Sequence, residues 1–288
     1  MLSDRALLIG ELLEKSSEIA LKYYNSPGTE LKPDQSVVTL ADKAIEEYLV
    51  SRLEDLENDV YVIGEETSES KSLSYIEQAL KKKAWIIDPI DGTSMYSARI
   101  PIWGISIGYA ENGVIVDGGV FAPCTAEMLL SSGGKTYYSQ PGTISDIPKW
   151  RERLEELSPV TSEFNGKTVI GEGQIQVHSG RFTCPNTINV FCSTIYEGIL
   201  LATGRHGALI CSSKLWDYAG VIQALCNLGF ASTSQTGKVN ILNREISIGN
   251  YKLPNAANKK GTFSVQEAIG ISSKLEYAQR IFSMWEPM

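Results

Sequence analysis

The chain has 288 residues, and its 26 lysines and arginines against 34 aspartates and glutamates give a formal net charge of −8. This acidic balance argues against a broad basic surface that would bind nucleic acid or an anionic membrane. Hydrophobic residues make up 43% and charged residues 21% of the chain, values that are ordinary for a globular protein and argue against long disorder.

The sequence lacks the signals of a membrane span and of a metal site built from nitrogen and sulfur. No apolar run approaches the ~20 residues that cross a bilayer, and residues 1–5 lack the basic stretch and apolar core of a secretory signal. The five cysteines are widely spaced without a Cys-x-x-Cys pair, and there are two histidines. We therefore expect a cytoplasmic protein with reduced thiols, in which oxygen atoms hold any metal.

Helix and strand patterns alternate in the first part of the chain. Apolar residues recur near every 3.6 positions over residues 2–23 and again over 39–56, which predicts two helices, the second with Thr39 as its N-cap. Runs rich in β-branched and aromatic residues predict strands at 60–63 and 85–87. Glu65 and Asp88 would then lie at the carboxyl ends of these strands.

A hairpin and the boundary between two lobes come next. Two apolar runs, 104–110 and 114–121, flank an Asn-Gly step that is typical of a tight hairpin turn, and residues 127–130 predict one more strand. Residues 133–159 are rich in Gly, Pro, Ser and charge, with one short helical pattern near 150–157. We place the lobe boundary in this stretch.

The second half repeats the mixture of elements. It predicts strands at 168–171 and 208–211 and helices at 194–203, 216–228 and 273–284. Strands mixed with helices in both halves favour an α/β or layered α+β fold. We expect one compact catalytic unit with an N-terminal lobe over residues 1–142 and a C-terminal lobe over residues 143–288.

The segment Asp88-Pro89-Ile90-Asp91-Gly92-Thr93 carries the clearest chemical signal. Two aspartates three positions apart at a strand end can direct both carboxylates into one space, while Gly92 and Thr93 open the next segment. Free N–H groups at such a start form an anion site. Carboxylates beside a bound phosphate require cations between them, and Mg²⁺ commonly bridges carboxylates to phosphate.

This segment has two other interpretations. An Asx-type turn with Gly92 as its turn glycine is the usual explanation of an isolated Asp-x-x-Asp-Gly. A calcium loop needs oxygen ligands at alternate positions and a Glu at the twelfth, but Ile90 and Arg99 stand at the third and twelfth positions from Asp88. The calcium loop therefore fails.

Three further segments accompany this one and favour the metal site over the turn. In chain order, four segments resemble the inositol monophosphatase family of magnesium-dependent, lithium-sensitive sugar-phosphate phosphatases: Thr39-Leu40-Ala41-Asp42, Gly64-Glu65-Glu66, Trp85-Ile86-Ile87-Asp88-Pro89-Ile90-Asp91-Gly92-Thr93 and Trp216-Asp217-Tyr218-Ala219-Gly220. The resemblance covers most of the chain.

The resemblance implies a set of metal ligands. One Mg²⁺ would be held by Glu65, Asp88 and the carbonyl of Ile90, and a second by Asp88, Asp91 and Asp217. A third, weaker ion would use the Glu65 carboxylate through waters, which makes two or three ions per site.

The resemblance also implies where the reacting groups lie. Phosphate would rest on the N–H groups of Gly92 and Thr93, and a metal-bound water near Glu65 would be oriented by the Thr93 hydroxyl, which contacts Asp42. The residues Ser94, Ser193 and Lys214 are candidates for contact with the substrate.

The implied activity is hydrolysis of a phosphate monoester. Alternating helix and sheet layers, an active site between two lobes and a homodimer are expected with it. Because residues 192–194 and 209–214 depart from the inositol-cleaving pattern, the expected substrate is a small phosphorylated polyol, sugar or amino alcohol such as histidinol phosphate. Phosphatases of 3′-phosphoadenosine phosphate or fructose bisphosphate are alternatives, as is a catalytically silent binding protein.

Overall fold

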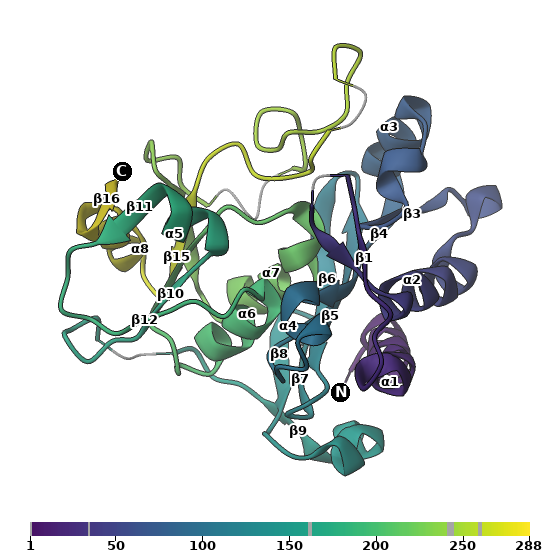
Figure 1. The fold of residues 1–288 in the computed structure, drawn as a ribbon, viewed down its shortest axis with the longest axis horizontal. Coiled ribbons are helices and arrows are strands. Elements are labelled where there is room, and N and C mark those ends of the chain that lie inside the picture. Colours follow the sequence, from purple (N-terminus) through teal and green to yellow (C-terminus); the bar gives the residue numbers. More distant parts are fainter. Residues whose placement is uncertain (1, 34, 161–162, 241–244, 259–260) are drawn as a thin grey trace.

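Two β-sheets of unequal size organise the computed structural model, which describes residues 2–33, 35–160, 163–240, 245–258 and 261–288 (Figure 1). The larger sheet has seven strands in sequential order: β3 (Val60–Gly64), β4 (Lys83–Asp91), β5 (Gly104–Glu111), β6 (Val114–Ala122), β7 (Glu127–Ser132), β8 (Lys135–Ser139) and β9 (Leu154–Glu156). The smaller sheet has the order β12 (Ile188–Asn189), β10 (Ile170–Glu172), β13 (Ala208–Cys211), β15 (Ile269–Ser272) and β14 (Ala231–Ser234).

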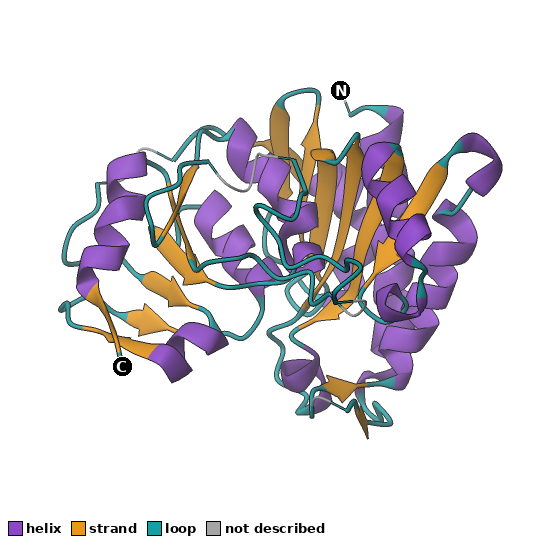
Figure 2. Ribbon diagram, turned by 90° about the horizontal axis from the view of Figure 1, so that it is seen from above, coloured by secondary structure: helices purple, strands orange, loops and turns teal. Residues whose placement is uncertain are grey.

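Helices separate and cover the sheets, so that five layers alternate (Figure 2). Helices α1 (Asp4–Tyr24) and α2 (Leu40–Leu53) cover one face of the large sheet, and α7 (Leu215–Asn227) packs on the other face with α6 (Thr194–Ala202) beside it. The small sheet follows, and α8 (Leu275–Met284) covers its far side. This arrangement confirms the expected alternation of helix and sheet layers.

Shorter elements complete the chain. They are α3 (Leu73–Lys81), α4 (Thr93–Ser97), α5 (Gln174–Ser179), the paired strands β1 (Glu30–Leu31) and β2 (Val37–Val38), and the paired strands β11 (Gly180–Phe182) and β16 (Trp285–Pro287). No helix among the described residues is long and apolar enough to cross a membrane.

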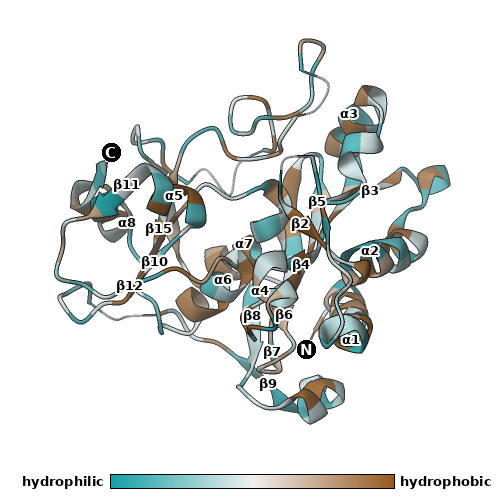
Figure 3. Cartoon of the chain, in the orientation of Figure 1, coloured by the Kyte–Doolittle hydropathy of each residue, from teal (hydrophilic) through white to brown (hydrophobic). Residues whose placement is uncertain are grey.

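The core lies on both faces of the large sheet. Alternate residues of β4 point to opposite sides: Trp85 and Ile87 pack towards α1 and α2, whereas Ala84 and Ile86 pack towards α6 and α7. Because both faces are buried, the strand is a continuous apolar run, without alternation of apolar and polar residues. Hydrophobic segments accordingly run through α6 and the strands of this sheet (Figure 3).

Most of the long predicted elements are confirmed within a few residues. Helix α2 begins after Thr39, whose hydroxyl accepts from the N–H of Ala41 and whose own N–H donates to Asp42 at 2.8 Å, a reciprocal cap. The predicted hairpin turn has Asn112 and Gly113 at φ of 50° and 74°, as a two-residue turn with positive φ at both positions requires.

The helical pattern predicted near residues 150–157 is wrong. A 3₁₀ helix covers Ile144–Arg153 with Pro148 inside it, and residues 154–156 form strand β9. Proline removes a backbone donor, which disfavours a regular α-helix, and Glu155 and Glu156 pair with Tyr138 and Tyr137 of β8. The large sheet therefore includes residues on both sides of position 142, and the division into two lobes stays a prediction.

Candidate active site

A cavity of about 240 Å³ opens at the ends of strands of both sheets and beside the first residues of α6 and α7. Glu65, Asp88 and Asp91 line it from the ends of β3 and β4, and Asp217 lines it from the start of α7. The structure thus gathers carboxylates that are up to 152 positions apart in the chain. Parallel pairing of β3 with β4 places the carboxyl ends of both strands at this edge.

A register shift brings the two aspartates of β4 to the same cavity. In a regular strand, residues three positions apart face opposite sides of the sheet. The pairing of β4 with β5 shifts between Asp88 and Asp91, and such an irregularity redirects a side chain. The Asp88 carboxylate also accepts the N–H of Ile90 at 3.1 Å, which fixes the turn around Pro89.

Gly92 is required at the junction of β4 and α4. It lies in the left-handed region with φ of 84°, and a Cβ atom there would come within 3.2 Å of the Ile102 carbonyl. No side chain caps the start of α4. The N–H groups of Gly92 and Thr93 consequently stand at the start of a helical turn, where intrahelical acceptors are missing.

Close packing of α7 on the large sheet positions Asp217. Gly220 donates its N–H to the Ser106 hydroxyl at 3.0 Å, and that hydroxyl donates to the Trp216 carbonyl at 2.9 Å. A Cβ on Gly220 would overlap the carbonyl of Gly119 on β6. One turn earlier, the Asp217 carboxylate accepts the backbone N–H of Lys214 at 2.8 Å and caps the helix.

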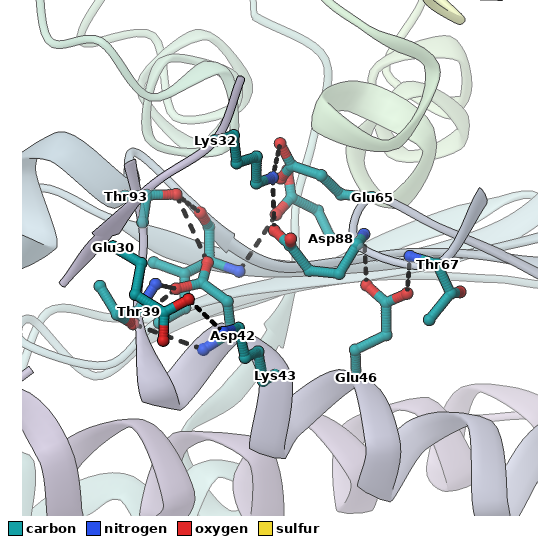
Figure 4. Close-up of polar contacts among 12 residues, drawn as sticks. Glu30, Lys32, Thr39, Asp42, Lys43, Glu46, Glu65, Thr67, Asp88 and Thr93 are labelled. Atoms are coloured by element: carbon teal, nitrogen blue, oxygen red, sulfur yellow. Dashed lines mark hydrogen bonds and ion pairs between the residues drawn. The ribbon is translucent and has the colours of Figure 1, made fainter. Parts of the chain in front are cut away.

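Two lysines hold the Glu65 carboxylate. The Nζ atoms of Lys32 and Lys214 each lie 3.4 Å from Oε1 of Glu65, and Lys32 also lies 2.7 Å from Oε1 of Glu66. Figure 4 shows Lys32 directed at Glu65 from the segment between β1 and β2. No motif marks Lys32, because it stands in a Pro/Gly/Asp-rich stretch of the chain.

Asp42 lies beneath the site and holds Thr93 in place. It is fully buried, accepts from the Thr39 hydroxyl at 2.5 Å and lies 3.4 Å from the Thr93 hydroxyl. That hydroxyl donates to the Ile90 carbonyl at 2.9 Å. Burial raises the pKa of Asp42 to about 7, even though its hydrogen bonds with Thr39 favour the charged form.

Glu46, which belongs to none of the four sequence motifs, supports the turn after Glu65. Its carboxylate is buried and accepts the N–H groups of Glu66 and Thr67 at 2.8 and 2.7 Å (Figure 4). A side chain at Gly64 would overlap this carboxylate. The available signal was the four-residue spacing from Asp42, which places both acids on the buried face of α2.

The candidate substrate residues differ in their surroundings. Ser193 lines the cavity, but it caps α6 and donates to Asp91 at 2.8 Å, so its hydroxyl is already used. The exposed Ser94 is not among the described residues that line the cavity. Lys214 does line it, and its side chain is 38% exposed.

The charges of the site fit a hard divalent cation. Oxygen atoms of Asp88, Asp91 and Asp217 lie within 4.8 Å of one another, and burial raises the pKa of all three carboxyls, that of Asp217 to about 7. Among the described residues, no lysine or arginine forms an ion pair with any of the three. Such a cluster of oxygen ligands is suited to Mg²⁺.

Comparisons with known proteins identify the family of this chain. A family model described as the inositol monophosphatase family matches residues 6–269. An inositol monophosphatase of Dictyostelium discoideum is 28% identical over 137 residues, which are 47% of this chain and 49% of that protein. A histidinol-phosphatase of Chlorobaculum parvum is 25% identical over 240 residues, 82% of this chain and 87% of that protein.

The fold also matches a solved structure along its length. An IMPase of Thermotoga maritima superposes with a TM-score of 0.71 at 20% identity and covers 98% of this chain and 97% of that one. At this level of identity, the likeness establishes the shared fold.

Proposed function

The chain belongs to the inositol monophosphatase family, and from this premise we propose that it is a metal-dependent phosphoric monoester hydrolase. The observation that carries the proposal is the convergence of Asp88, Asp91 and Asp217 in one cavity, beside the uncapped start of α4. The expected reaction is the attack of water on the phosphorus of a small phosphate ester, which releases an alcohol and phosphate.

We assign the ligands as follows. Glu65, Asp88 and the Ile90 carbonyl would hold one Mg²⁺, and Asp88, Asp91 and Asp217 would hold another. Magnesium bound there would lower the pKa of a water molecule and neutralise charge in the transition state of an in-line displacement. The charge of two such ions would equal that of the four carboxylates, so the phosphate would meet a site without excess negative charge.

The remaining residues bind and orient. The N–H groups of Gly92 and Thr93 would receive phosphate oxygens, as at other helix starts. The Thr93 hydroxyl would orient the attacking water, because Asp42 and the Ile90 carbonyl fix its position at 3.4 and 2.9 Å. Positioning and charge neutralisation supply most of the catalysis in phosphoryl transfer.

The substrate that we propose is a small phosphorylated polyol, sugar or amino alcohol. A volume of about 240 Å³ is below the ~300–1,000 Å³ of pockets for drug-sized ligands. A small phosphate ester fits within this volume. The similarity to a histidinol-phosphatase over 82% of the chain makes an amino alcohol phosphate a specific member of the test panel.

An Asp88→Asn variant tests the metal-dependent mechanism. Wild-type protein with Mg²⁺ is expected to hydrolyse at least one ester of a panel of inositol, glycerol, sugar and histidinol phosphates. The variant should lose at least ~10³-fold in kcat/KM, about 4 kcal/mol of transition-state stabilisation, and excess chelator should abolish wild-type turnover. Full activity of the variant, or of the chelated enzyme, would contradict the mechanism.

We also propose that the enzyme works in the cytoplasm as a homodimer, binding a small phosphorylated metabolite and neither nucleic acid nor membrane. The family resemblance supports the dimer, and the net charge of −8 supports the absence of nucleic acid. Light scattering coupled to size-exclusion chromatography measures the oligomeric state, and a monomer at micromolar concentration would contradict the dimer.

A further inference from the structure

Lys214 stands at a point where two proposed metal ligands meet. Its backbone N–H donates to Asp217 at 2.8 Å, and its ammonium group lies 3.4 Å from Oε1 of Glu65, 149 positions away in the chain. The backbone is held by a β-bridge between Lys214 and Ser264. One lysine thus links the start of α7 to the end of β3.

Contacts of the Lys214 side chain hold its ammonium group in one place. The side chain is 38% exposed, and its ammonium lies 5.4 Å from the centre of the Trp216 ring, a distance at which a cation and an aromatic face attract. The ammonium is thus held between the Glu65 carboxylate and the Trp216 ring.

A second ammonium group, that of Lys32, forms an ion pair with the same oxygen of Glu65. Lys32 also lies 3.4 Å from Oε1. A Mg²⁺ ion at its usual ~2.1 Å from Oε1 would lie no more than about 5.5 Å from either ammonium nitrogen. Like charges so close disfavour a divalent ion on Oε1, which leaves Oε2 of Glu65 for an ion shared with Asp88.

We infer that the Lys214 ammonium is a resident cation of this site, which occupies the Glu65 Oε1 position and limits the chain to two divalent ions. The inference rests on the metal site of the proposed function. It assigns Lys214 a positioning role: the lysine holds Oε1 of Glu65 and so directs Oε2 towards the ion shared with Asp88.

Counting bound ions tests this inference without any measurement of turnover. Metal-free protein is titrated with Mn²⁺ and the free ion is followed by electron paramagnetic resonance. Wild type is expected to bind two ions per chain. The variants are made in a Lys32→Met background, because Lys32 would otherwise keep a second ammonium group 3.4 Å from Oε1. In that background Lys214 should still give two ions, Lys214→Met, which keeps the apolar stem but removes the charge, should bind a third, weaker ion, and Lys214→Arg should restore two.

A surface lysine provides the matched control. Lys82, whose side chain is 46% exposed, pairs with Asp59 at 3.0 Å outside the site, and Lys82→Met should bind two ions. Circular dichroism verifies the folding of each variant, and Lys214→Gln replaces the methionine variant if that one does not fold. Three ions in wild type, or two in the folded variant that lacks the Lys214 charge, would overturn the inference.

The outcome is separable from that of the proposed function. A protein that binds two ions but hydrolyses none of the esters would refute the phosphatase and leave the role of Lys214 intact. A protein that hydrolyses an ester with three ions bound would refute the role of Lys214 and leave the phosphatase intact.

Discussion

At the scale of single residues, burial raises the pKa values of the clustered carboxyl groups of the site. Asp88, Asp91 and Asp217 lie together without an ion-pair partner among the described residues, and each therefore has a raised pKa. Divalent ions reverse this logic, because they favour the charged form. The metal-free site is consequently a cost to the folded state at neutral pH.

At Glu46, which is not a proposed metal ligand, the free energy cost of burying an ionised carboxylate can be measured. Burial raises its pKa from 4.5 to about 7, so the folded state binds its proton more tightly than the unfolded state. The stability it contributes is complete below pH 4.5 and is lost as the pH rises to about 7. In metal-free protein, the free energy of unfolding of wild type should fall relative to that of Glu46→Gln by about 3 kcal/mol over this interval.

Urea unfolding at a series of pH values measures this difference. The neighbouring Glu47 is exposed, so Glu47→Gln is the control and should follow wild type at every pH. A difference between Glu46→Gln and wild type that does not change with pH would contradict the assignment.

At the scale of elements, the helix α7 depends on glycine where it meets the sheet. A Cβ on Gly220 would overlap the Gly119 carbonyl and lie 2.7 Å from the Ser106 hydroxyl. Gly220→Ala should therefore push α7 away from the sheet, lower the free energy of unfolding by about 2–3 kcal/mol and weaken Mg²⁺ binding through displacement of Asp217.

Denaturant unfolding and a Mg²⁺ titration measure the two effects. Gly166 is exposed with no atom near its potential Cβ, so Gly166→Ala should change stability by less than ~0.5 kcal/mol. Equal stability of the two alanine variants would show that α7 tolerates the larger residue.

An element could be predicted from the sequence when its own residues carry the complete pattern of a helix, turn or strand. Helix α2, the hairpin at Asn112 and strand β13 have patterns complete within themselves, and the sequence predicts them closely. Strand β9 depends on Tyr137 and Tyr138 of β8, and no local pattern reveals a partner in another strand. The same reason separates the site residues: Asp88 and Asp91 stand in a motif, whereas Lys32 and Glu46 act through neighbours distant in sequence.

At the scale of the whole molecule, ligands from distant segments couple metal binding to global stability. Asp88 lies on the large sheet and Asp217 on α7, so an ion held by both ties these elements together. A concentration of Mg²⁺ at ~100 times its dissociation constant should stabilise the fold by about 2.7 kcal/mol, a rise of roughly 4–5 °C in Tm for a chain of 288 residues. Differential scanning fluorimetry at constant ionic strength measures this shift.

The variant Asp217→Asn sharpens that experiment. It should lose most of the Mg²⁺-dependent rise in Tm, and its metal-free form should be at least as stable as metal-free wild type, because it removes one of three clustered negative charges. A rise equal to that of wild type would place the stabilising ions elsewhere.

The position of α7 between the two sheets has a consequence for the order of events during synthesis. The large sheet is complete in sequence at Glu156, but the helix that covers one of its faces begins at Leu215, about 60 residues later. At ~5–20 residues per second, the ribosome takes roughly 3–12 s to add this interval. During that time the apolar face of the sheet that α7 will cover is exposed to solvent. We expect the nascent chain to aggregate or to bind chaperones most readily in this interval.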